Sequence, residues 1–288
     1  MGETLRLIGS VFKLRIAVAI TLCALGGVAV TPGAVPGPWQ IAALALAVML
    51  SAASAGAFNQ YVERDLDARM RRTEGRPFVT GRLKAGPLWL GIILATLALA
   101  VGLAALALNS WVALHTFLGA FVYGVVYTVW LKRRTWLNIV LGGLAGSFAV
   151  LAGAAAVDPG LTAAPVVLAI VLFLWTPPHF WSLAAALRDD YARAGVPMLP
   201  VVVGDVLAAK VIFAHTLTLV LLSLVPAFLS LGWIYLLGAA TGGAFFVAKS
   251  WQLVRAPSRK AAMGNFFASL IQLSLMLTGA IADRLLLA

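Results

Sequence analysis

The sequence predicts an all-α membrane protein, from its composition, the spacing of its charges and its turn residues. Hydrophobic residues make up 62% of the 288 residues and charged residues only 11%, which is typical of a chain that crosses a membrane several times. A spanning helix needs about 20 apolar residues. The charge-free windows long enough for this are Ile16–Val62 (47 residues), Ala85–Leu131 (47), Thr135–Val157 (23), Pro159–Leu187 (29), Val211–Ala248 (38) and Ala261–Ala282 (22).

The windows of 47 and 38 residues are long enough for two helices each and the others for one, so the sequence predicts nine transmembrane helices in a single domain over residues 1–288. Turn residues divide the long windows at 31–38, at Asn109-Ser110 and, least sharply, near Leu231-Gly232. We expect helices at about 12–30, 39–63, 86–108, 111–131, 136–157, 163–187, 211–230, 233–249 and 264–283.

The distribution of basic residues predicts the orientation in the membrane. The net charge of +11 would suit a nucleic-acid partner, but 20 of the 21 Lys and Arg fall in the N-terminus and in the loops after the second, fourth, sixth and eighth predicted helices. Basic loops stay in the cytoplasm, so we expect a bacterial inner (cell) membrane protein with a cytoplasmic N-terminus and no nucleic-acid partner. The C-terminus is expected on the opposite side. Cys23 is the sole cysteine, which excludes a disulfide within the chain.

A stripe of oxygen-bearing side chains marks the end of the second predicted helix. Asn59, Glu63 and Asp67 are spaced at i, i+4 and i+8, so on a helix they share one face over about 12 Å. Oxygen ligands of this kind suit Mg²⁺ together with phosphate oxygens. Asp65 points elsewhere and is expected to serve another partner or to mark the helix end. The alternative is that these acids are only solvated charges beside a membrane span.

Cations follow the acidic stripe and recur at a second cytoplasmic loop. Seven Lys or Arg lie between residues 64 and 84, among them Arg72 and Arg76, which are candidates for binding an anionic substrate. The second loop offers Tyr127, Lys132 and Arg133, because lysine binds phosphate as a point charge and arginine can bind it through two N–H groups. The alternative for both loops is a topological one: basic residues and interfacial aromatic residues that only anchor the helix ends.

A third cluster follows in the next cytoplasmic loop: Pro177, Pro178, His179, Asp189, Asp190 and Tyr191. Two prolines inside a span are expected to break the helix, directly before His179. On a continuous helix His179 and Asp190 lie about 20° apart and about 16 Å apart along the axis, so both would face one cavity. The alternative for an intramembrane histidine is an interhelical hydrogen bond, which we assign to His115 and His215. All three clusters are expected on the cytoplasmic side of the membrane. This disfavours a transporter, because in a transporter polar groups should recur through the depth of the membrane.

Together the three clusters resemble the UbiA superfamily of intramembrane prenyltransferases, and its haem O synthase branch in particular. The acidic motif Asn-x-x-x-Asp-x-x-x-Asp of that superfamily stands here as Asn59, Glu63 and Asp67, with Glu in place of the commoner Asp. The branch is further resembled by Tyr127-Thr128, Leu131-Lys132-Arg133, Thr176-Pro177-Pro178-His179-Phe180-Trp181, Asp189-Asp190-Tyr191 and Gly195-Val196-Pro197-Met198-Leu199-Pro200. The similarity covers about residues 59–200. One departure is the run Ser147-Phe148-Ala149-Val150, where the branch commonly has prolines.

The resemblance implies a UbiA-like bundle with a central cavity open to the cytoplasm. It also implies transfer of a farnesyl group from farnesyl diphosphate to a vinyl group of haem B, with addition of water, to give haem O and diphosphate. Mg²⁺ would be held by Asn59, Glu63, Asp67 and Asp190, with Lys132 beside it. The substrate-binding residues would be Arg72, Arg76, Tyr127, Arg133, His179, Asp189 and Tyr191. His179 is expected to contact haem.

The resemblance also suggests partners, and two other functions stay open. Besides its substrates and the lipid bilayer, the chain would meet a downstream haem A synthase or oxidase assembly factors. One alternative is a UbiA-type enzyme that prenylates an aromatic quinone precursor. The other is a haem carrier without catalytic activity, in which the acids only fix topology. The main hypothesis requires that the acids of the first and third clusters converge and share one metal-bound diphosphate.

Overall fold

The computed structural model describes residues 2–287, and every regular element in this part of the chain is a helix. The helices are α1 (Gly2–Val11), α2 (Leu14–Val30), α3 (Pro38–Val62), α4 (Arg64–Asp67), α5 (Pro87–Ala107), α6 (Ser110–Phe121), the π-helix η1 (Val122–Leu131), α7 (Asn138–Gly142), α8 (Leu144–Val157), α9 (Ala163–Ala186), α10 (Arg188–Arg193), α11 (Leu199–Val203), α12 (Asp205–Ser223), the 3₁₀-helix η2 (Val225–Phe228), α13 (Trp233–Arg255) and α14 (Arg259–Leu286). An all-helical fold is therefore confirmed.

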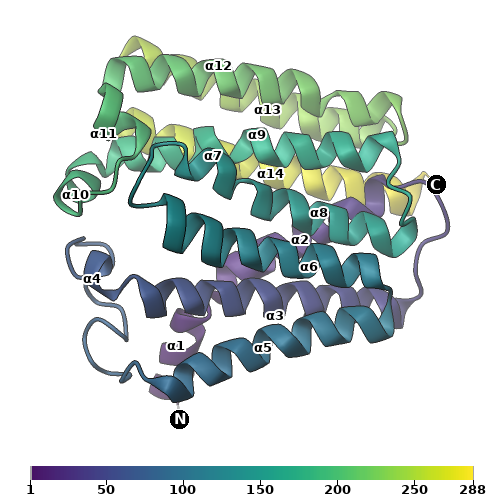
Figure 1. The fold of residues 1–288 in the computed structure, drawn as a ribbon. Helices are drawn as coiled ribbons and strands as arrows, with labels where there is room; N and C mark the ends of the chain where they lie inside the picture. The colour runs from purple at the N-terminus through teal and green to yellow at the C-terminus, as the bar shows by residue number, and fades with distance from the viewer. Residues whose placement is uncertain (1, 288) are drawn as a thin grey trace.

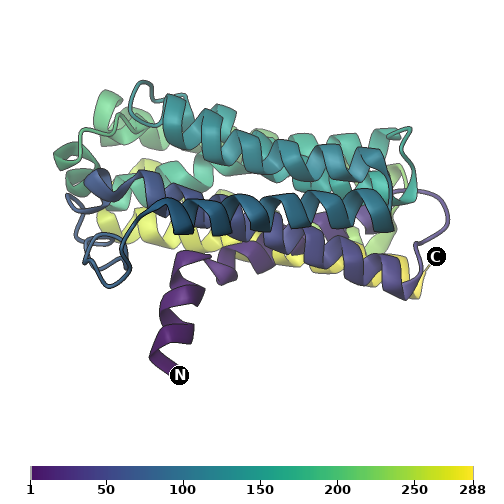
Figure 2. The same cartoon turned by 60° about the horizontal axis from the view of Figure 1, so that its bottom comes forward.

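The long helices run roughly parallel or antiparallel to one another in a bundle, and several short helices collect at one end of it (Figure 1). That end holds α4, α10 and α11, and the C-terminus lies at the opposite end (Figure 1). The helix α1 stands at a steep angle to the bundle (Figure 2). The three polar clusters predicted from the sequence follow α3, η1 and α9, so the fold brings all three to the end that carries the short helices.

Seven helical segments are long and apolar enough to cross a membrane: Pro38–Val62, Pro87–Ala107, Ser110–Leu131, Asn138–Val157, Ala163–Ala186, Asp205–Phe228 and Arg259–Leu286. Two of the nine predicted spans are not among them. The helix α2 has only 17 residues, and α13 is long enough but contains three glycines, three tyrosine or tryptophan residues and Lys249, which lower its hydropathy. Seven candidate spans are established, and nine crossings stay a prediction.

The expected helix break at Pro177 and Pro178 is wrong, because α9 continues through both prolines to Ala186. Proline has no N–H to donate to the carbonyl four residues earlier, but prolines are tolerated inside transmembrane helices where neighbouring groups satisfy the freed backbone. The break comes instead at Leu187, whose φ of −121° and ψ of 30° separate α9 from α10. The calculation that placed His179 and Asp190 on one continuous helical face therefore does not hold.

Close helix approach at glycine brings α2 against α8 in the centre of the fold. A Cβ atom at Gly153 would lie 1.8 Å from the carbonyl oxygen of Ala24, and one at Gly27 would lie 2.1 Å from that of Val150. Only glycine allows the two backbones to meet at these points, as is common where helices pack in a membrane. At the end away from the short helices, Asp283 of α14 accepts hydrogen bonds from the backbone N–H groups of Gly232 and Tyr235 and so caps α13.

Candidate active site

The structure keeps the predicted acidic stripe of Asn59, Glu63 and Asp67 on one face, even though α3 ends at Val62. The backbone N–H of Glu63 donates to the carbonyl of Asn59 over 3.0 Å, and that of Asp67 donates to the carbonyl of Glu63 over 2.8 Å. Because both i→i+4 bonds are kept across the boundary of α3 and α4, the three side chains stay on one face. All three are almost completely buried, with exposed fractions of 2%, 0% and 2% for Asn59, Glu63 and Asp67.

Glu63 forms the centre of this site and pairs with Lys132, a residue of the second cluster that was predicted to bind phosphate. Its Oε2 accepts from the Lys132 ammonium at 2.5 Å. Its Oε1 is buried and has no hydrogen-bond partner. A carboxylate oxygen without a partner in the interior costs free energy, so this atom has bonding capacity for a cation that lies against Glu63.

Asp67 is held by the loop that follows it. Its Oδ2 accepts from the Arg76 guanidinium at 2.6 Å, and its backbone carbonyl accepts from the Thr73 hydroxyl at 2.9 Å. Arg76 was predicted to bind substrate, and the structure places it directly against a proposed metal ligand. Arg72 lies exposed in the same loop.

Asn59 connects α3 to η1 and to the N-terminal segment. Its Nδ2 donates to the Thr128 hydroxyl at 3.0 Å, and the Thr128 hydroxyl donates to the carbonyl of Tyr123 at 2.8 Å, five residues earlier. Both Thr128 and Tyr123 lie in the π-helix η1, and π-helical turns are frequent at functional sites. The same helix stacks the rings of Tyr123 and Tyr127, whose centroids are 5.6 Å apart.

Lys13 is part of this site, and sequence reasoning missed it. Its ammonium group donates to Asn59 Oδ1 at 2.6 Å and to the Tyr123 hydroxyl at 3.2 Å. Burial, together with the nearby charges of Arg76 and Lys132 and against the opposing effect of the acids, lowers the pKa of Lys13 to about 7. In the sequence it resembles any basic residue before a first span. The available signal was its place in an apolar stretch, Val11-Phe12-Lys13-Leu14.

Asp65 and Arg133 form a separate pair on the exposed side of the site. Arg133 donates to both carboxylate oxygens of Asp65, each at 2.7 Å, and the two side chains are 43% and 52% exposed. The hydrogen bonds from Arg133 hold the pKa of Asp65 below its usual value. The expectation that Asp65 serves a different partner from Asp67 is confirmed. Arg133, predicted to bind substrate, is engaged with Asp65.

The third cluster reaches the first two through apolar packing. Tyr191 is buried in one hydrophobic cluster with Leu66 and Met70 of the first loop, and Tyr127 packs against that cluster. Asp190 pairs with Arg193, and Asp189 is exposed. Within residues 2–287 no hydrogen bond or ion pair joins Asp189 or Asp190 to the acidic stripe, and no three His, Cys, Asp or Glu side chains are grouped closely enough to hold a metal ion. Shared ligation by both acidic sets stays a prediction.

His179 lies on the face of α9 that packs against α14. Its ring stacks between Trp175 and Phe266, with centroid distances of 4.2 and 4.5 Å, and Phe180 meets it edge-on at 4.9 Å. Its Nδ1 lies 2.7 Å from the Ser269 hydroxyl. His179 thus makes the interhelical hydrogen bond that was the alternative to a functional role, and this bond occupies one ring nitrogen.

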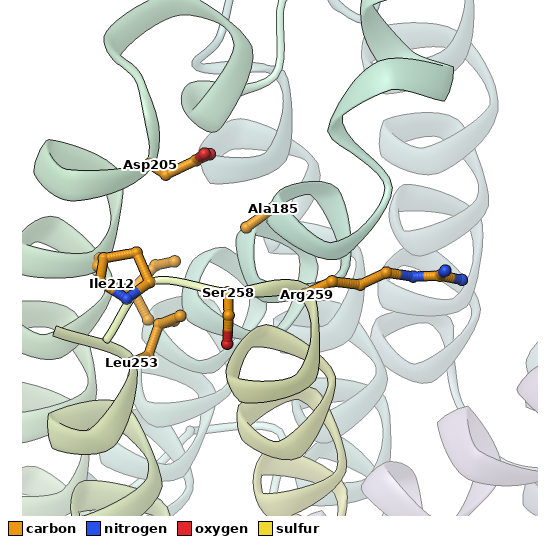
Figure 3. A pocket seen from close by; sticks show the side chains of 8 residues that line it. Ala185, Asp205, Ile212, Leu253, Ser258 and Arg259 are labelled. Atoms are coloured by element: carbon orange, nitrogen blue, oxygen red, sulfur yellow. The ribbon is translucent and has the colours of Figure 1, made fainter. Parts of the chain in front are cut away.

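A small cavity of about 50 Å³ opens near the same end of the bundle but away from these residues (Figure 3). It is lined by Ala185, Asp205, Ala209, Ile212, Leu253, Pro257, Ser258 and Arg259. None of the predicted site residues lines it. It reflects the packing of α9, α12, α13 and α14 and is distinct from the acidic site.

The geometry defines a site with oxygen donors and a surplus of cations at one end of a membrane bundle. Comparison with known proteins identifies its class: residues 20–271 match the UbiA prenyltransferase family, and the chain belongs to this family. It is a multi-pass integral membrane protein and a prenyltransferase.

Two relatives with high sequence identity carry the same name, protoheme IX farnesyltransferase. The chain is 61% identical over 287 residues, covering 99% of both chains, to protoheme IX farnesyltransferase 2 of Paramagnetospirillum magneticum. It is 50% identical over 275 residues, covering 94% of this chain and 96% of the relative, to protoheme IX farnesyltransferase 1 of the same organism.

Solved structures share the fold at low sequence identity. A structure of digeranylgeranylglyceryl phosphate synthase superimposes with a TM-score of 0.79 at 17% identity, covering 98% of this chain and 99% of the other. A UbiA homologue from Archaeoglobus fulgidus bound to DMAPP and Mg²⁺ superimposes with a TM-score of 0.72 at 16% identity, covering 97% and 99%. These likenesses establish a UbiA-like fold.

Proposed function

We propose that this protein transfers the farnesyl group of farnesyl diphosphate to a vinyl group of haem B, with addition of water, and releases haem O and diphosphate. The observation that supports this proposal is the 61% identity, over 99% of both chains, to a protein named protoheme IX farnesyltransferase 2. The product would serve the assembly of terminal oxidases that use modified haem.

The acidic stripe supports a Mg²⁺–diphosphate site. Mg²⁺ takes oxygen ligands, and the stripe offers the unpartnered Glu63 Oε1 beside the side chains of Asn59 and Asp67. These three residues and Asp190 would hold the ion, which when bound neutralises charge on the leaving diphosphate. The UbiA homologue with bound Mg²⁺ has the same fold, which is consistent with this assignment.

The cations of the site would bind the diphosphate itself. Lys132 and Arg76 are paired with Glu63 and Asp67, and Lys13 is bonded to Asn59. A diphosphate carries more negative charge than the carboxylates of Glu63 and Asp67 together. The three cations would therefore bind its oxygens. Arg72, Arg133, Asp189 and Tyr191 would complete the rim of the site. Charge stabilisation of this kind is commonly the largest contribution to catalysis.

The bond changes of the proposed reaction balance without an oxidant. The allylic C–O bond breaks and its electron pair leaves with the diphosphate. The vinyl group forms the new C–C bond, and water adds its hydroxyl to the resulting cation while its proton is lost. The stacked rings of Tyr123 and Tyr127 stabilise positive charge through their π faces, and they keep water from the allylic carbon.

The same proposal assigns the membrane arrangement. The chain forms one domain with nine crossings, in which α2 and α13 complete the seven candidate spans. The acidic site, the N-terminus and the basic loops lie in the cytoplasm and the C-terminus on the opposite side, as the basic residues favour. A central cavity opens on the cytoplasmic side and holds both substrates.

The test is the mass of the product from purified protein. The chain is incubated with haem B, farnesyl diphosphate and Mg²⁺, and we expect haem O, with no product when a chelator removes Mg²⁺. Parallel reactions replace haem B by aromatic quinone precursors. A prenylated quinone precursor with no haem O would overturn the proposed acceptor, and retention of haem B with no prenylated product of any kind would indicate a haem carrier.

A further inference from the structure

The hydrogen bonds of the Ser269 hydroxyl determine which ring nitrogen of His179 carries a proton. Its hydroxyl oxygen lies 2.6 Å from the carbonyl oxygen of Phe266 and 2.7 Å from His179 Nδ1. A hydroxyl has one proton to donate, and a carbonyl oxygen has none. The Ser269 proton must therefore point to Phe266, and Ser269 can only accept from His179.

It follows that His179 carries its proton on Nδ1. A neutral imidazole has one N–H and one lone pair, so the lone pair of His179 lies on Nε2. The ring cannot readily rotate to exchange these positions, because Trp175 and Phe266 stack on its two faces at centroid distances of 4.2 and 4.5 Å. The Trp175 indole N–H also donates to the backbone carbonyl of Ser269 at 3.0 Å, which ties the stack to the same residue.

The other two histidines lack this arrangement. In both His115 and His215 the Nδ1 atom is buried and has no hydrogen-bond partner. Within the described part of the chain, His179 is therefore the histidine whose Nδ1 is bonded to a side chain, and that bond gives its lone pair a defined direction.

A second hydrogen bond fixes the register that brings Ser269 to His179. Asn265, four residues before Ser269 and so on the same face of α14, donates from Nδ2 to the Ser182 hydroxyl at 2.8 Å. Ser182 lies on α9, three residues after His179, and donates to the carbonyl of Pro178. All these side chains except that of His179 are 0% exposed, and His179 is 7% exposed.

We propose that Ser269 is a positioning residue that holds His179 in the Nδ1–H tautomer, so that the Nε2 lone pair is presented to the iron of the haem substrate. The inference rests on the proposed function. Metal-bound histidines generally donate their second N–H to an acceptor that fixes the ring and tunes its basicity. A neutral hydroxyl is a weaker acceptor than a carboxylate, so it leaves His179 a moderate ligand. Moderate ligation suits haem that must leave as product.

The experiment is a titration of the purified full-length chain with haem B, followed by the visible absorption spectrum, which reports the axial ligand. Loss of the histidine in His179→Ala is expected to remove the nitrogen-ligand spectrum. Ser269→Ala is expected to weaken haem affinity by about tenfold or more and to alter the spectrum, while Ser269→Thr restores both because it keeps the hydroxyl. Ser223→Ala removes another fully buried serine hydroxyl, which donates to the backbone carbonyl of Val220 away from His179, and it should keep the wild-type spectrum.

A chemical complementation separates positioning from folding. In His179→Gly, added imidazole can ligate iron and donate its N–H to Ser269, whereas 1-methylimidazole has no N–H to donate. We expect the protein–haem complex to favour imidazole over 1-methylimidazole, and we expect Ser269→Ala to abolish that preference. An equal preference with and without the serine hydroxyl would overturn the inference, and so would a wild-type spectrum in His179→Ala.

These outcomes are distinguishable from failure of the proposed function. Haem O formation is measured by mass on the same wild-type preparation. If no haem O forms but the spectrum depends on His179 and Ser269 as expected, the proposed reaction is wrong and the positioning role stands. If haem O forms and the spectrum is indifferent to both residues, the positioning role is wrong.

Discussion

The acidic site near α4 and the polar chain between α9, α12, α13 and α14 are both buried, but they consist of different groups. In the acidic site, Glu63, Asp67 and Asn59 are each bonded to a cation. The polar chain is neutral throughout. Because Asn265 Oδ1 can only accept, the hydroxyl protons run in one direction along it, from Thr216 to Ser250, then to Asn265, Ser182 and the carbonyl of Pro178.

This difference separates a region that can bind a ligand from a region that holds helices together. The charged groups of the acidic site can bind a charged ligand, which a neutral chain of hydrogen bonds cannot do as strongly. The acidic site also keeps an unpartnered oxygen on Glu63. In the polar chain each hydroxyl proton is already used within the bundle. Substitutions in the first region should therefore reduce activity more than stability, and substitutions in the second should do the opposite.

The largest effect is expected for Glu63→Gln. The amide cannot neutralise Lys132 and offers a weaker ligand to a cation, so we expect the rate of haem O formation to fall by about 100-fold or more. The matched control is Glu74→Gln, the same chemical change at an exposed position in the same loop, which should keep near-wild-type activity. Product formation in Glu63→Gln within a few fold of wild type would show that the acidic site has no catalytic role.

Lys13→Met is expected to have the next largest effect and to separate activity from stability. The substitution removes the ammonium group bonded to Asn59, so we expect kcat/KM for farnesyl diphosphate to fall by about tenfold or more. Burial disfavours the charged form of Lys13, whose pKa is lowered to about 7, so the melting temperature should stay the same or rise.

The control for this prediction is Arg15→Met, an exposed cation two residues further along. It should leave both activity and melting temperature close to wild type. A Lys13→Met protein with normal kcat/KM and a lower melting temperature would place Lys13 among the residues that stabilise the fold.

The acidic site could be predicted from sequence where local spacing decides the geometry. Asn59, Glu63 and Asp67 share a face because backbone hydrogen bonds between residues four apart continue past the end of α3. The position of the three polar clusters at one end of the bundle could also be predicted, because spans that cross a membrane alternate in direction and the clusters follow every second predicted span.

Contacts that depend on packing between distant segments could not be predicted. Lys13 meets Asn59 because residue 13 adopts a left-handed conformation with φ of 48° and packs against Gly56 on α3, where an added Cβ would lie 3.3 Å from the Lys13 side chain. No pattern near residue 13 encodes that contact. The helix break expected at Pro177 failed for a similar reason, since α9 continues through both prolines while packed among neighbouring helices, and that packing cannot be predicted from the local sequence.

Thr216→Val tests the neutral region with an isosteric change. It removes the hydroxyl that donates to Ser250, and the loss of one buried hydrogen bond is expected to lower the free energy of unfolding by about 1 kcal/mol with activity per folded molecule unchanged. Thr218→Val is the control on the same helix, because Thr218 is exposed and bonds only to the backbone of Ala214. If Thr216→Val lowered the activity per folded molecule and left the free energy of unfolding unchanged, the proposed contrast between the two regions would be wrong.

The smallest effect is expected for Asp65→Asn, which removes a charge beside the acidic site but outside its buried part. The pair with Arg133 is about half exposed, so it should contribute less than about 1 kcal/mol to stability. Hydrogen bonds from Arg133 lower the pKa of Asp65, so the folded state binds this proton less readily than the unfolded state does. The contribution is therefore complete above the ordinary aspartate pKa of about 3.9 and is lost as the pH falls through the lower pKa of the folded protein.

The measurement is the difference in melting temperature between wild type and Asp65→Asn across a pH series. We expect a small difference at neutral pH that shrinks towards zero in acid, while Glu63→Gln loses its activity at every pH. Taking the difference removes the titration of all other acids that the two proteins share. A difference that grows as the pH falls would mean that Asp65 is protonated more readily in the folded protein, and the exposed pair would then belong with the buried charges of the acidic site.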